Sequence, residues 1–228
     1  VQLPDPAPDR YVLSNMPPAP DQHDISACAV NVCATAINFG MARYGMPDFR
    51  ISRLFLYYNT RRYIMRLPDL GCDSGCSRRD VCKAAVKYGG CQEVLWPYSR
   101  QLMGSEPPQH LYSAARRMPR FSYRRVPQNL HHMVACLLDR NPIMMGMNVY
   151  SNMSTVKKSG VMPMPDASDT KLGAHAVLVC GYDLTTKRFV VQNCWGLGWG
   201  SAGFFEVPME FALDPGHCWD LWVMTLHQ

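Results

Sequence analysis

Polar and apolar positions recur with the period of helices through the first half of the chain. Small and apolar residues run over 27–45 without a proline, which predicts a buried helix with Ser26 as its N-cap. Two further helices are predicted over 51–64 and 76–90, and the glycine pair at 89–90 is a C-cap signal. The residues before this region are rich in proline and polar side chains, so we expect them to be extended or looped.

Beyond about residue 120 the spacing changes to the alternation of strands. One short helix is still expected over 128–141, closed by Asn141 and Pro142. Strand-like segments separated by turn residues occur at 121–126, 142–150, 174–183, 188–194, 203–207 and 221–226. Helices in the first half and an antiparallel sheet in the second half predict an α+β chain with two lobes.

Composition narrows the classes of function. The 228 residues include 23 basic and 18 acidic side chains, a formal net charge of +5, and the basic residues are scattered. A nucleic-acid-binding protein is expected to have a basic stripe with aromatic side chains for stacking, so we expect no nucleic-acid partner. No apolar run reaches about 18 residues, and the N-terminal residues include proline and charge, so neither a membrane span nor a signal peptide is predicted.

Ten cysteines are present, and they cannot all pair if one of them is a nucleophile. Cys180 and Cys194 lie in apolar strand contexts, so we expect them to pack as small hydrophobic side chains. A zinc site among the four cysteines within 72–91 is a further hypothesis. It is disfavoured, because their spacing matches no common zinc motif. We therefore expect no metal.

The segment 172–200 has the pattern of a β-hairpin with a histidine near one end and an asparagine near the other. A turn at 183–185 makes His175 and Asn193 direct cross-strand partners, although a shift of one residue would break this register. The Asn193 amide could then bond one imidazole nitrogen and leave the other to act as a base. Without a nucleophile, a packed strand histidine explains the pattern equally well.

Cys28 is the candidate nucleophile, because it falls in the first turn of the predicted buried helix. The partial positive charge of a helix N-terminus and a nearby imidazolium both favour a thiolate over a thiol. Cys33 lies farther into the helix and is interpreted as a core residue. Gln22 precedes Cys28 by six residues, where its amide could donate to a developing oxyanion, although a surface glutamine is the simpler interpretation of this residue alone.

These stretches together resemble the papain family of cysteine proteases, in particular its bacterial and viral branches. The six-residue spacing from Gln22 to Cys28 matches the oxyanion glutamine and the nucleophile of that family. The stretch 173–183 resembles its histidine strand, and 190–208 resembles its asparagine–tryptophan segment. The resemblance extends over about residues 10–224.

The resemblance implies a role for each matching residue. Cys28 would attack the scissile carbonyl carbon, and His175 would pair with the thiolate and later protonate the leaving amine. Asn193 would orient His175, while Trp195 would shield their hydrogen bond from water and border the substrate. Gln22 and the backbone N–H of Cys28 would form the oxyanion hole. The implied activity is that of an endopeptidase working through an acyl-thioenzyme, without a cofactor.

The resemblance also implies substrate-binding residues and partners. Gly75 would supply the backbone strip that pairs with an extended substrate. Ala174, next to His175, would line the specificity pocket with Met145 or Met147, which favours an apolar substrate side chain. The expected partners are a protein or peptide substrate and, as regulators, a pro-segment or a protein inhibitor. The enzyme is expected to be a monomer.

The chain departs from the family pattern in the loop before the nucleophile. His23, Asp24 and Ile25 replace the usual glycine and cysteine between Gln22 and Cys28. A disulfide that is common in the family should therefore be missing. No departure removes a catalytic group, but His23 and Asp24 could change the shape and the pH response of this loop.

The resemblance implies a single peptidase unit over 1–228, with the active-site cleft between its two lobes. A helical lobe is expected over about 18–115 together with 217–228. A β-rich lobe is expected over about 1–17 together with 116–216.

Two other functions stay open at this point. An exopeptidase or another amide hydrolase of the same family would need a loop that blocks one end of the cleft, and only 160–173 could do this. A non-catalytic binding module would keep the scaffold, although all four catalytic residue types are present. The sequence leaves the substrate and the compartment open, and an intracellular or virus-infected-cell setting is favoured over a lysosomal or secreted one.

Overall fold

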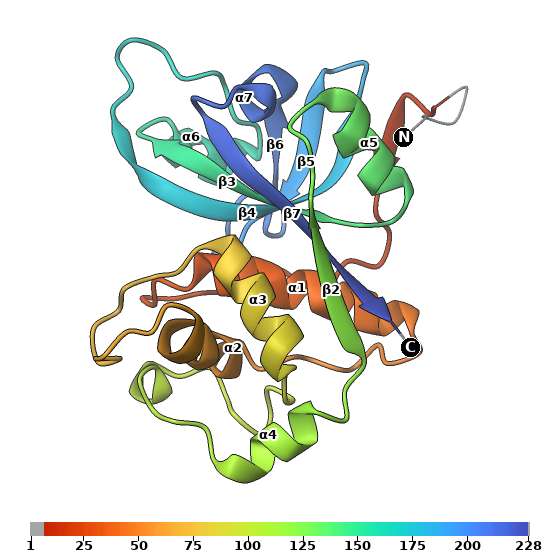
Figure 1. The fold of residues 1–228 in the computed structure, drawn as a ribbon. Coiled ribbons are helices and arrows are strands. Elements are labelled where there is room, and N and C mark those ends of the chain that lie inside the picture. The colour runs from red at the N-terminus through yellow and green to blue at the C-terminus, as the bar shows by residue number, and fades with distance from the viewer. Residues whose placement is uncertain (1–6, 228) are drawn as a thin grey trace. The chain divides into compact units, whose positions relative to one another are not determined.

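The computed structural model describes residues 7–227, which form two compact units (Figure 1). The β unit comprises 7–21 and Arg125–Val223, and the helical unit comprises Gln22–Arg124 and 224–227. The expectation of an extended chain at residues 1–6 lies outside the described residues. None of the helices within 7–227 is both long and apolar enough to cross a membrane.

Helices dominate the helical unit, and the first three of them pack against one another (Figure 1). A π-helical turn continues the second helix directly. The bounds are α1 (Cys28–Arg43), α2 (Arg53–Asn59), η1 (Thr60–Ile64), α3 (Arg78–Tyr88), η2 (Arg100–Leu102) and α4 (Gln109–Ala115). The three predicted helices of this half are confirmed, whereas α4 was not predicted.

The start of α1 differs from the sequence-based prediction. Its N-cap is Ala27, which has no side chain able to cap, so the prediction of Ser26 as N-cap is wrong. The backbone N–H of Ser26 instead donates to a carboxylate oxygen of Asp73 over 2.8 Å. Cys28 is consequently the first residue of the helix, as the nucleophile hypothesis requires. The predicted stop of α3 is confirmed, because Gly89 is its C-cap with φ at 67°.

The β unit is built around one long central strand, β4, with β3 and β1 along one edge and β5 along the other. The order of its strands is β7-β3-β4-β5-β6, and each neighbouring pair in this order is antiparallel. The strands are β1 (Arg10–Val12), β3 (Ile143–Tyr150), β4 (Lys171–Asp183), β5 (Arg188–Gln192), β6 (Phe204–Pro208) and β7 (Cys218–His227). An α+β fold with an antiparallel sheet is thereby confirmed.

Three helices accompany this sheet. Helix α5 packs against β1, β3 and β4, and α7 packs against β5 and β6 (Figure 1). Their bounds are α5 (Leu130–Leu138), α6 (Met153–Ser159) and α7 (Met209–Leu213). Only α5 was predicted, because α6 and α7 are too short for a clear helical period. In the helical unit, β2 (Arg120–Arg125) pairs with the end of β7, where the hydroxyls of Ser122 and Thr225 are hydrogen-bonded over 2.7 Å.

The β4–β5 hairpin has a wider turn than predicted. Asp183 faces Arg188, so the turn covers four residues rather than 183–185. The Asp183 carboxylate accepts the N–H of Thr186 over 2.9 Å, and Lys187 adopts a left-handed conformation with φ at 54°. A side chain that accepts a backbone N–H inside the turn stabilises this longer connection.

The predicted cross-strand pairing of His175 with Asn193 is wrong. A β-bulge between Val179 and Gly181 shifts the β4–β5 register, and β5 ends at Gln192. The Cα partner of His175 is Met147 on the opposite neighbour, β3. Asn193 therefore follows the strand rather than belonging to it, and any contact with His175 depends on the chain beyond β5.

Candidate active site

Cys28 is half-buried at the N-terminus of α1, a helix of 16 residues that is buried along most of its length. The unsatisfied N–H groups of such an end favour a negative charge, and therefore a thiolate. Cys33 has no exposed surface, which confirms its interpretation as a core residue. Burial raises the pKa of Cys76, and the charge of Cys28 raises it further, so Cys76 stays a neutral thiol near the candidate nucleophile.

The loop before Cys28 is closed by hydrogen bonds from Gln22. Its side-chain amide donates to the backbone carbonyl of Ile25 over 2.9 Å, and its backbone carbonyl accepts the Ile25 N–H over 3.2 Å. The Tyr98 hydroxyl donates to the same Gln22 carbonyl over 3.0 Å. His23 has φ at 48° in this tight turn, a left-handed conformation that fits the glycine usual in the family pattern. The bond from Nε2 to the Ile25 carbonyl fixes the direction of the Gln22 carboxamide, and the other two bonds hold the Gln22 backbone.

Gly75 lies against the same loop. Its φ is 67°, and a Cβ added there would lie 3.4 Å from the carbonyl oxygen of Ser26. Its backbone N–H donates to the hydroxyl of Tyr57 over 3.0 Å. The left-handed backbone and the close approach both explain a glycine at this position. Within the helical unit, Gln22, Cys28 and Gly75 thus belong to neighbouring segments.

In the β unit, His175 and Asn193 form the hydrogen bond that the sequence led us to expect. Nε2 of His175 lies 2.8 Å from Oδ1 of Asn193. The backbone N–H of Cys194 also donates to Oδ1 over 2.8 Å, so the atom that faces His175 must be the oxygen. Nε2 therefore carries the proton, and in the neutral ring Nδ1 is the basic nitrogen.

The bond is enclosed by aromatic and buried groups. The ring of His175 stacks on Trp195 with centroids 4.5 Å apart, and Trp199 meets Trp195 edge-on at 5.1 Å. His175 is 6% exposed and Asn193 is 1% exposed. Cys194 is fully buried, as predicted for a small hydrophobic side chain, with its sulfur 3.9 Å from Nε2. The low water access strengthens the His175–Asn193 bond.

One polar atom at this position has no partner. Nδ2 of Asn193 is buried without a hydrogen-bond acceptor among residues 7–227. Burying a donor in this way costs about 1–3 kcal/mol. The cost is tolerated because the other end of the amide accepts from both His175 and Cys194. The amide is thus oriented for the histidine at the expense of stability.

The expected substrate-pocket residues have different environments. Ala174 is exposed and pairs with Asn148 on β3. Met145 and Met147 have no exposed surface, and Met145 pairs with Val177. The described structure therefore presents Ala174 to solvent but encloses both methionines.

Sequence reasoning missed Asp73, Tyr57 and Arg100, although all three contact the segments that hold Cys28 and Gly75. A single aspartate in a polar loop has no periodic signal, and its partner Ser26 lies 47 residues away. The nearest available signal was the loss of the usual cysteine in the loop before Cys28.

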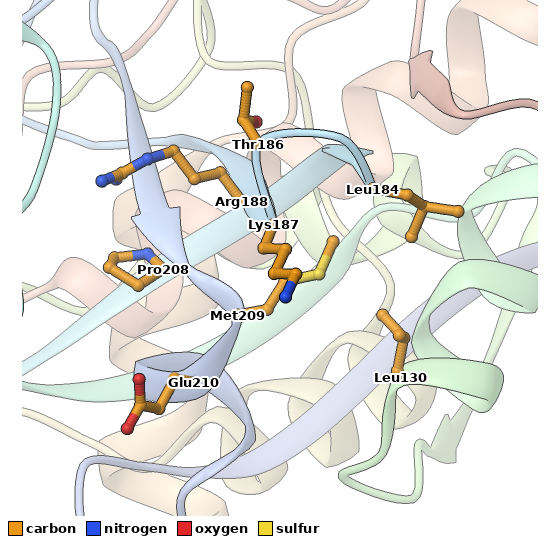
Figure 2. Close-up of a pocket in the computed structure, with 8 residues that line it drawn as sticks. All are labelled: Leu130, Leu184, Thr186, Lys187, Arg188, Pro208, Met209 and Glu210. Atoms are coloured by element: carbon orange, nitrogen blue, oxygen red, sulfur yellow. The ribbon is translucent and has the colours of Figure 1, made fainter.

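A cavity of about 450 Å³ in the β unit lies apart from His175. Figure 2 shows that it is formed at the hairpin turn, with Leu184, Lys187 and Met209 among its lining residues. His175 is nine residues before Leu184, or about 30 Å of extended chain. The cavity is therefore not part of the histidine site. No group of three His, Cys, Asp or Glu side chains within 7–227 is arranged to hold a metal ion.

Comparison with known proteins gives consistent matches. The family profile described as papain family cysteine protease matches residues 60–218. An uncharacterized peptidase C1-like protein of Acanthamoeba polyphaga mimivirus is 30% identical over 215 residues, which cover 90% of this chain and 68% of that protein. Xylellain, a cysteine protease from Xylella fastidiosa, has a TM-score of 0.89 and 31% identity, over 97% of this chain and 87% of its own. A digestive procathepsin L 3 of Tenebrio molitor larval midgut, 16% identical, shares the fold with a TM-score of 0.74, over 100% of this chain and 72% of its own.

Proposed function

The chain belongs to the papain family of cysteine proteases, and we propose that it is an endopeptidase that works through an acyl-thioenzyme. Cys28 is the nucleophile, His175 the acid and base, and Asn193 the residue that orients the histidine. Gln22 and the backbone N–H of Cys28 donate to the oxyanion. The substrate is a protein or peptide.

The observation that carries this proposal is the fixed tautomer of His175. Its Nε2 is occupied by Asn193 Oδ1 at 2.8 Å, and the N–H of Cys194 prevents the opposite orientation of the amide. A strand histidine that serves only packing needs no such second donor. Nδ1 is left as the nitrogen that can exchange a proton with a thiol, which is the role of the base in a nucleophile–base pair.

The proposed reaction has two halves. The Cys28 thiolate attacks the scissile carbonyl carbon, and Gln22 and the Cys28 N–H stabilise the negative oxygen. The C–N bond breaks as Nδ1–H of His175 protonates the leaving amine, which gives a thioester. Nδ1 then takes a proton from water, the hydroxide adds to the thioester carbon, and the C–S bond breaks to release the acid and the thiolate.

Substrate binding is proposed at Gly75, Ala174 and Trp195. Gly75 offers its backbone carbonyl beside the loop before Cys28, since its N–H already donates to the Tyr57 hydroxyl over 3.0 Å. Ala174 is exposed next to His175, and the half-buried Trp195 borders the same ring. Met145 stays a prediction as a pocket residue; it has no exposed surface and is paired with Val177 rather than with a residue next to Ala174. A pro-segment or protein inhibitor that occupies these residues, and a monomeric enzyme, stay predictions.

Selective alkylation tests the nucleophile. Cys72 is exposed, so a Cys72→Ser background removes the most accessible competing thiol. Iodoacetamide near pH 6 should modify Cys28, and His175→Ala should abolish this, because less than about 1% of an unassisted thiol is ionised there. His217→Ala is a matched control, since His217 is also a partly buried histidine of the β unit. No preference among the thiols would overturn the proposal.

Peptides blocked at both ends test the mode of cleavage. An endopeptidase should cleave them internally, and Cys28→Ala should abolish the cleavage. Cleavage restricted to peptides with a free terminus would replace this proposal with an exopeptidase. The segment 160–173, the one candidate for a blocking loop, is fastened at its end, where the Ser151 hydroxyl donates to Asp169 over 2.8 Å.

A further inference from the structure

We infer that Asp73 is a positioning residue for the proposed reaction, because it joins the loop that leads into Cys28 to the Gly75 strip. This inference rests on the proposed roles of Cys28 and Gly75. All of the residues involved belong to the helical unit.

Asp73 accepts hydrogen bonds on both oxygens. Oδ2 accepts the backbone N–H of Ser26 at 2.8 Å and Nη1 of Arg100 at 3.1 Å. Oδ1 accepts the hydroxyl of Tyr57 at 2.6 Å. The Asp73 side chain is only 12% exposed, although two of its donors, Ser26 and Arg100, lie at the surface. A carboxylate with three donors is strongly fixed, since charge-assisted bonds are about twice as strong as neutral ones.

The first bond controls the entrance to α1. Ser26 lies two residues before Cys28, and its N–H is not part of the helix, which starts at Cys28. Arg100 also donates to the carbonyl of Asp24 over 2.8 Å. The loop is therefore attached at two points, Asp24 and Ser26, to one ion pair. Both attachments fix the direction in which the backbone N–H of Cys28 points.

The second oxygen controls the Gly75 strip. The Tyr57 hydroxyl donates to Asp73 and accepts the N–H of Gly75 over 3.0 Å. Its ring is fully buried, which leaves the hydroxyl little freedom. The Gly75 backbone is also close to Ser26, as the 3.4 Å separation from an added Cβ indicates. Asp73 thus links the Gly75 backbone, through the Tyr57 hydroxyl, to the loop that precedes Cys28.

A buried arginine holds the other side of the same segment. Arg61 has no exposed surface and donates to the carbonyls of Leu70 and Cys72 and, over 3.2 Å, to the hydroxyl of Ser74. Asp73 is thereby enclosed by bonds to its neighbours on both sides. Cys72, next to Asp73, forms no disulfide, so polar bonds hold this segment in place.

The test compares three variants of the full chain on a fluorogenic peptide that the wild type cleaves. Asp73→Asn removes the charge that strengthens these bonds and leaves one acceptor oxygen for donors on two sides, Tyr57 on one and Ser26 with Arg100 on the other, so kcat/KM should fall about 10–100-fold. Tyr57→Phe keeps the ring and should raise KM about fivefold with a smaller effect on kcat. Asp80→Asn is the matched control, because that helix carboxylate bonds only Ser77 and Lys83 among the described contacts and should leave both constants unchanged.

Two further readouts separate position from fold and from activity. Alkylation of Cys28 by iodoacetamide needs the thiolate but no oxyanion hole, so it should persist in Asp73→Asn. Amide hydrogen exchange should be slow at Ser26 in the wild type and faster in Asp73→Asn, and it should be faster at Gly75 in Tyr57→Phe. This exchange does not depend on activity, so it also decides the matter in a wild type that fails to cleave.

Several results would overturn the inference. These are equal kcat/KM in Asp73→Asn and Asp80→Asn, an unprotected Ser26 amide in the wild type, or a loss of alkylation in parallel with hydrolysis. Absence of selective alkylation at wild-type Cys28, with Ser26 protected as expected, would instead count against the proposed nucleophile. The two failures are therefore distinguishable.

Discussion

The backbone N–H of Cys194 and the imidazole of His175 share one acceptor, the side-chain oxygen of Asn193, each at 2.8 Å. Two donors on one oxygen leave no choice in the orientation of the amide. The protonated nitrogen of His175 is therefore decided by a backbone group one residue beyond the asparagine. This geometry makes the role of Asn193 directly testable.

Replacing Asn193 by alanine should lower kcat/KM about 100-fold, because His175 loses its fixed tautomer and part of its acid–base contribution. The protein should also lose about 1–3 kcal/mol of unfolding free energy, since the Nε2–H is left without an acceptor. Steady-state kinetics and urea unfolding measure the two effects. Replacement of the nearby Cys194 by alanine retains the backbone N–H and should leave kcat/KM within a few-fold of the wild type. A large loss there would contradict this account.

Trp195 should matter through its ring rather than through a polar group. Trp195→Ala removes the stack on His175 and the edge contact with Trp199, which at about 0.5–1.5 kcal/mol each predicts a loss of about 2 kcal/mol. Water then reaches the His175–Asn193 bond, and kcat should fall. Trp195→Phe keeps a stacking ring and should retain most of both quantities. Equal effects of the two substitutions on kcat and on urea unfolding would refute the shielding role.

Acid should release the Asp73 network. Burial raises the pKa of Asp73, but the hydrogen bonds from Tyr57 and Ser26 and the charge of Arg100 outweigh this and leave it below its ordinary value. A lowered folded-state pKa contributes stability above the unfolded-state value of about 3.9, and this contribution is lost as pH falls through the lowered pKa. Thermal midpoints should therefore drop more steeply below about pH 4 in the wild type than in Asp73→Asn.

A substitution of Arg100 offers a second test of the pH dependence of stability. Arg100→Met removes a cation that lowers the pKa of Asp73, so the acid-induced loss of stability should move to higher pH. The account would be contradicted if the thermal midpoints of Asp73→Asn and the wild type stayed parallel between about pH 5 and about pH 2, the range around the ordinary Asp pKa. Asp73 would then titrate alike in the folded and the unfolded state.

Arg61 is buried and its neighbour Arg62 is exposed, so substitutions at these two positions show how much the buried guanidinium contributes to the unfolding free energy. Arg61→Met leaves the carbonyls of Leu70 and Cys72 without their donor and should cost about 3 kcal/mol of unfolding free energy. Arg62 is exposed and reaches only the Leu67 carbonyl at 3.3 Å among its described bonds, so Arg62→Met should cost less than about 0.5 kcal/mol. Urea unfolding at one pH measures both. Similar costs would mean that the buried guanidinium contributes little.

How far the sequence could predict this protein is clearest at the hairpin. Alternation predicted β4 and β5, and the His175–Asn193 bond is present, yet the pairing that suggested it is wrong. The width of a turn and the position of a bulge depend on side-chain bonds such as Asp183 to Thr186, which periodicity does not report. The resemblance to a known family gave the partners correctly where strand arithmetic did not.

The start of α1 shows a second limit. Small apolar residues predicted the helix, and Cys28 is at its first position, but Ser26 does not cap it. Ser26 is instead held outside the helix, where its backbone N–H donates to Asp73, 47 residues away in the chain. Local rules rank the residues that could cap a helix, but they do not include a distant carboxylate that fixes the chain just before the helix begins. Long-range polar contacts of this kind need coordinates.

The bulge between Val179 and Gly181 divides β4 into two parts with separate alignments. On the histidine side, β3 sets the register through Met147 and its neighbours. On the far side, β1 and β5 align the strand up to Asp183. A change of register caused by an insertion or a reporter group at the hairpin turn would therefore not be passed on to His175. The turn is thus a place where this scaffold tolerates variation.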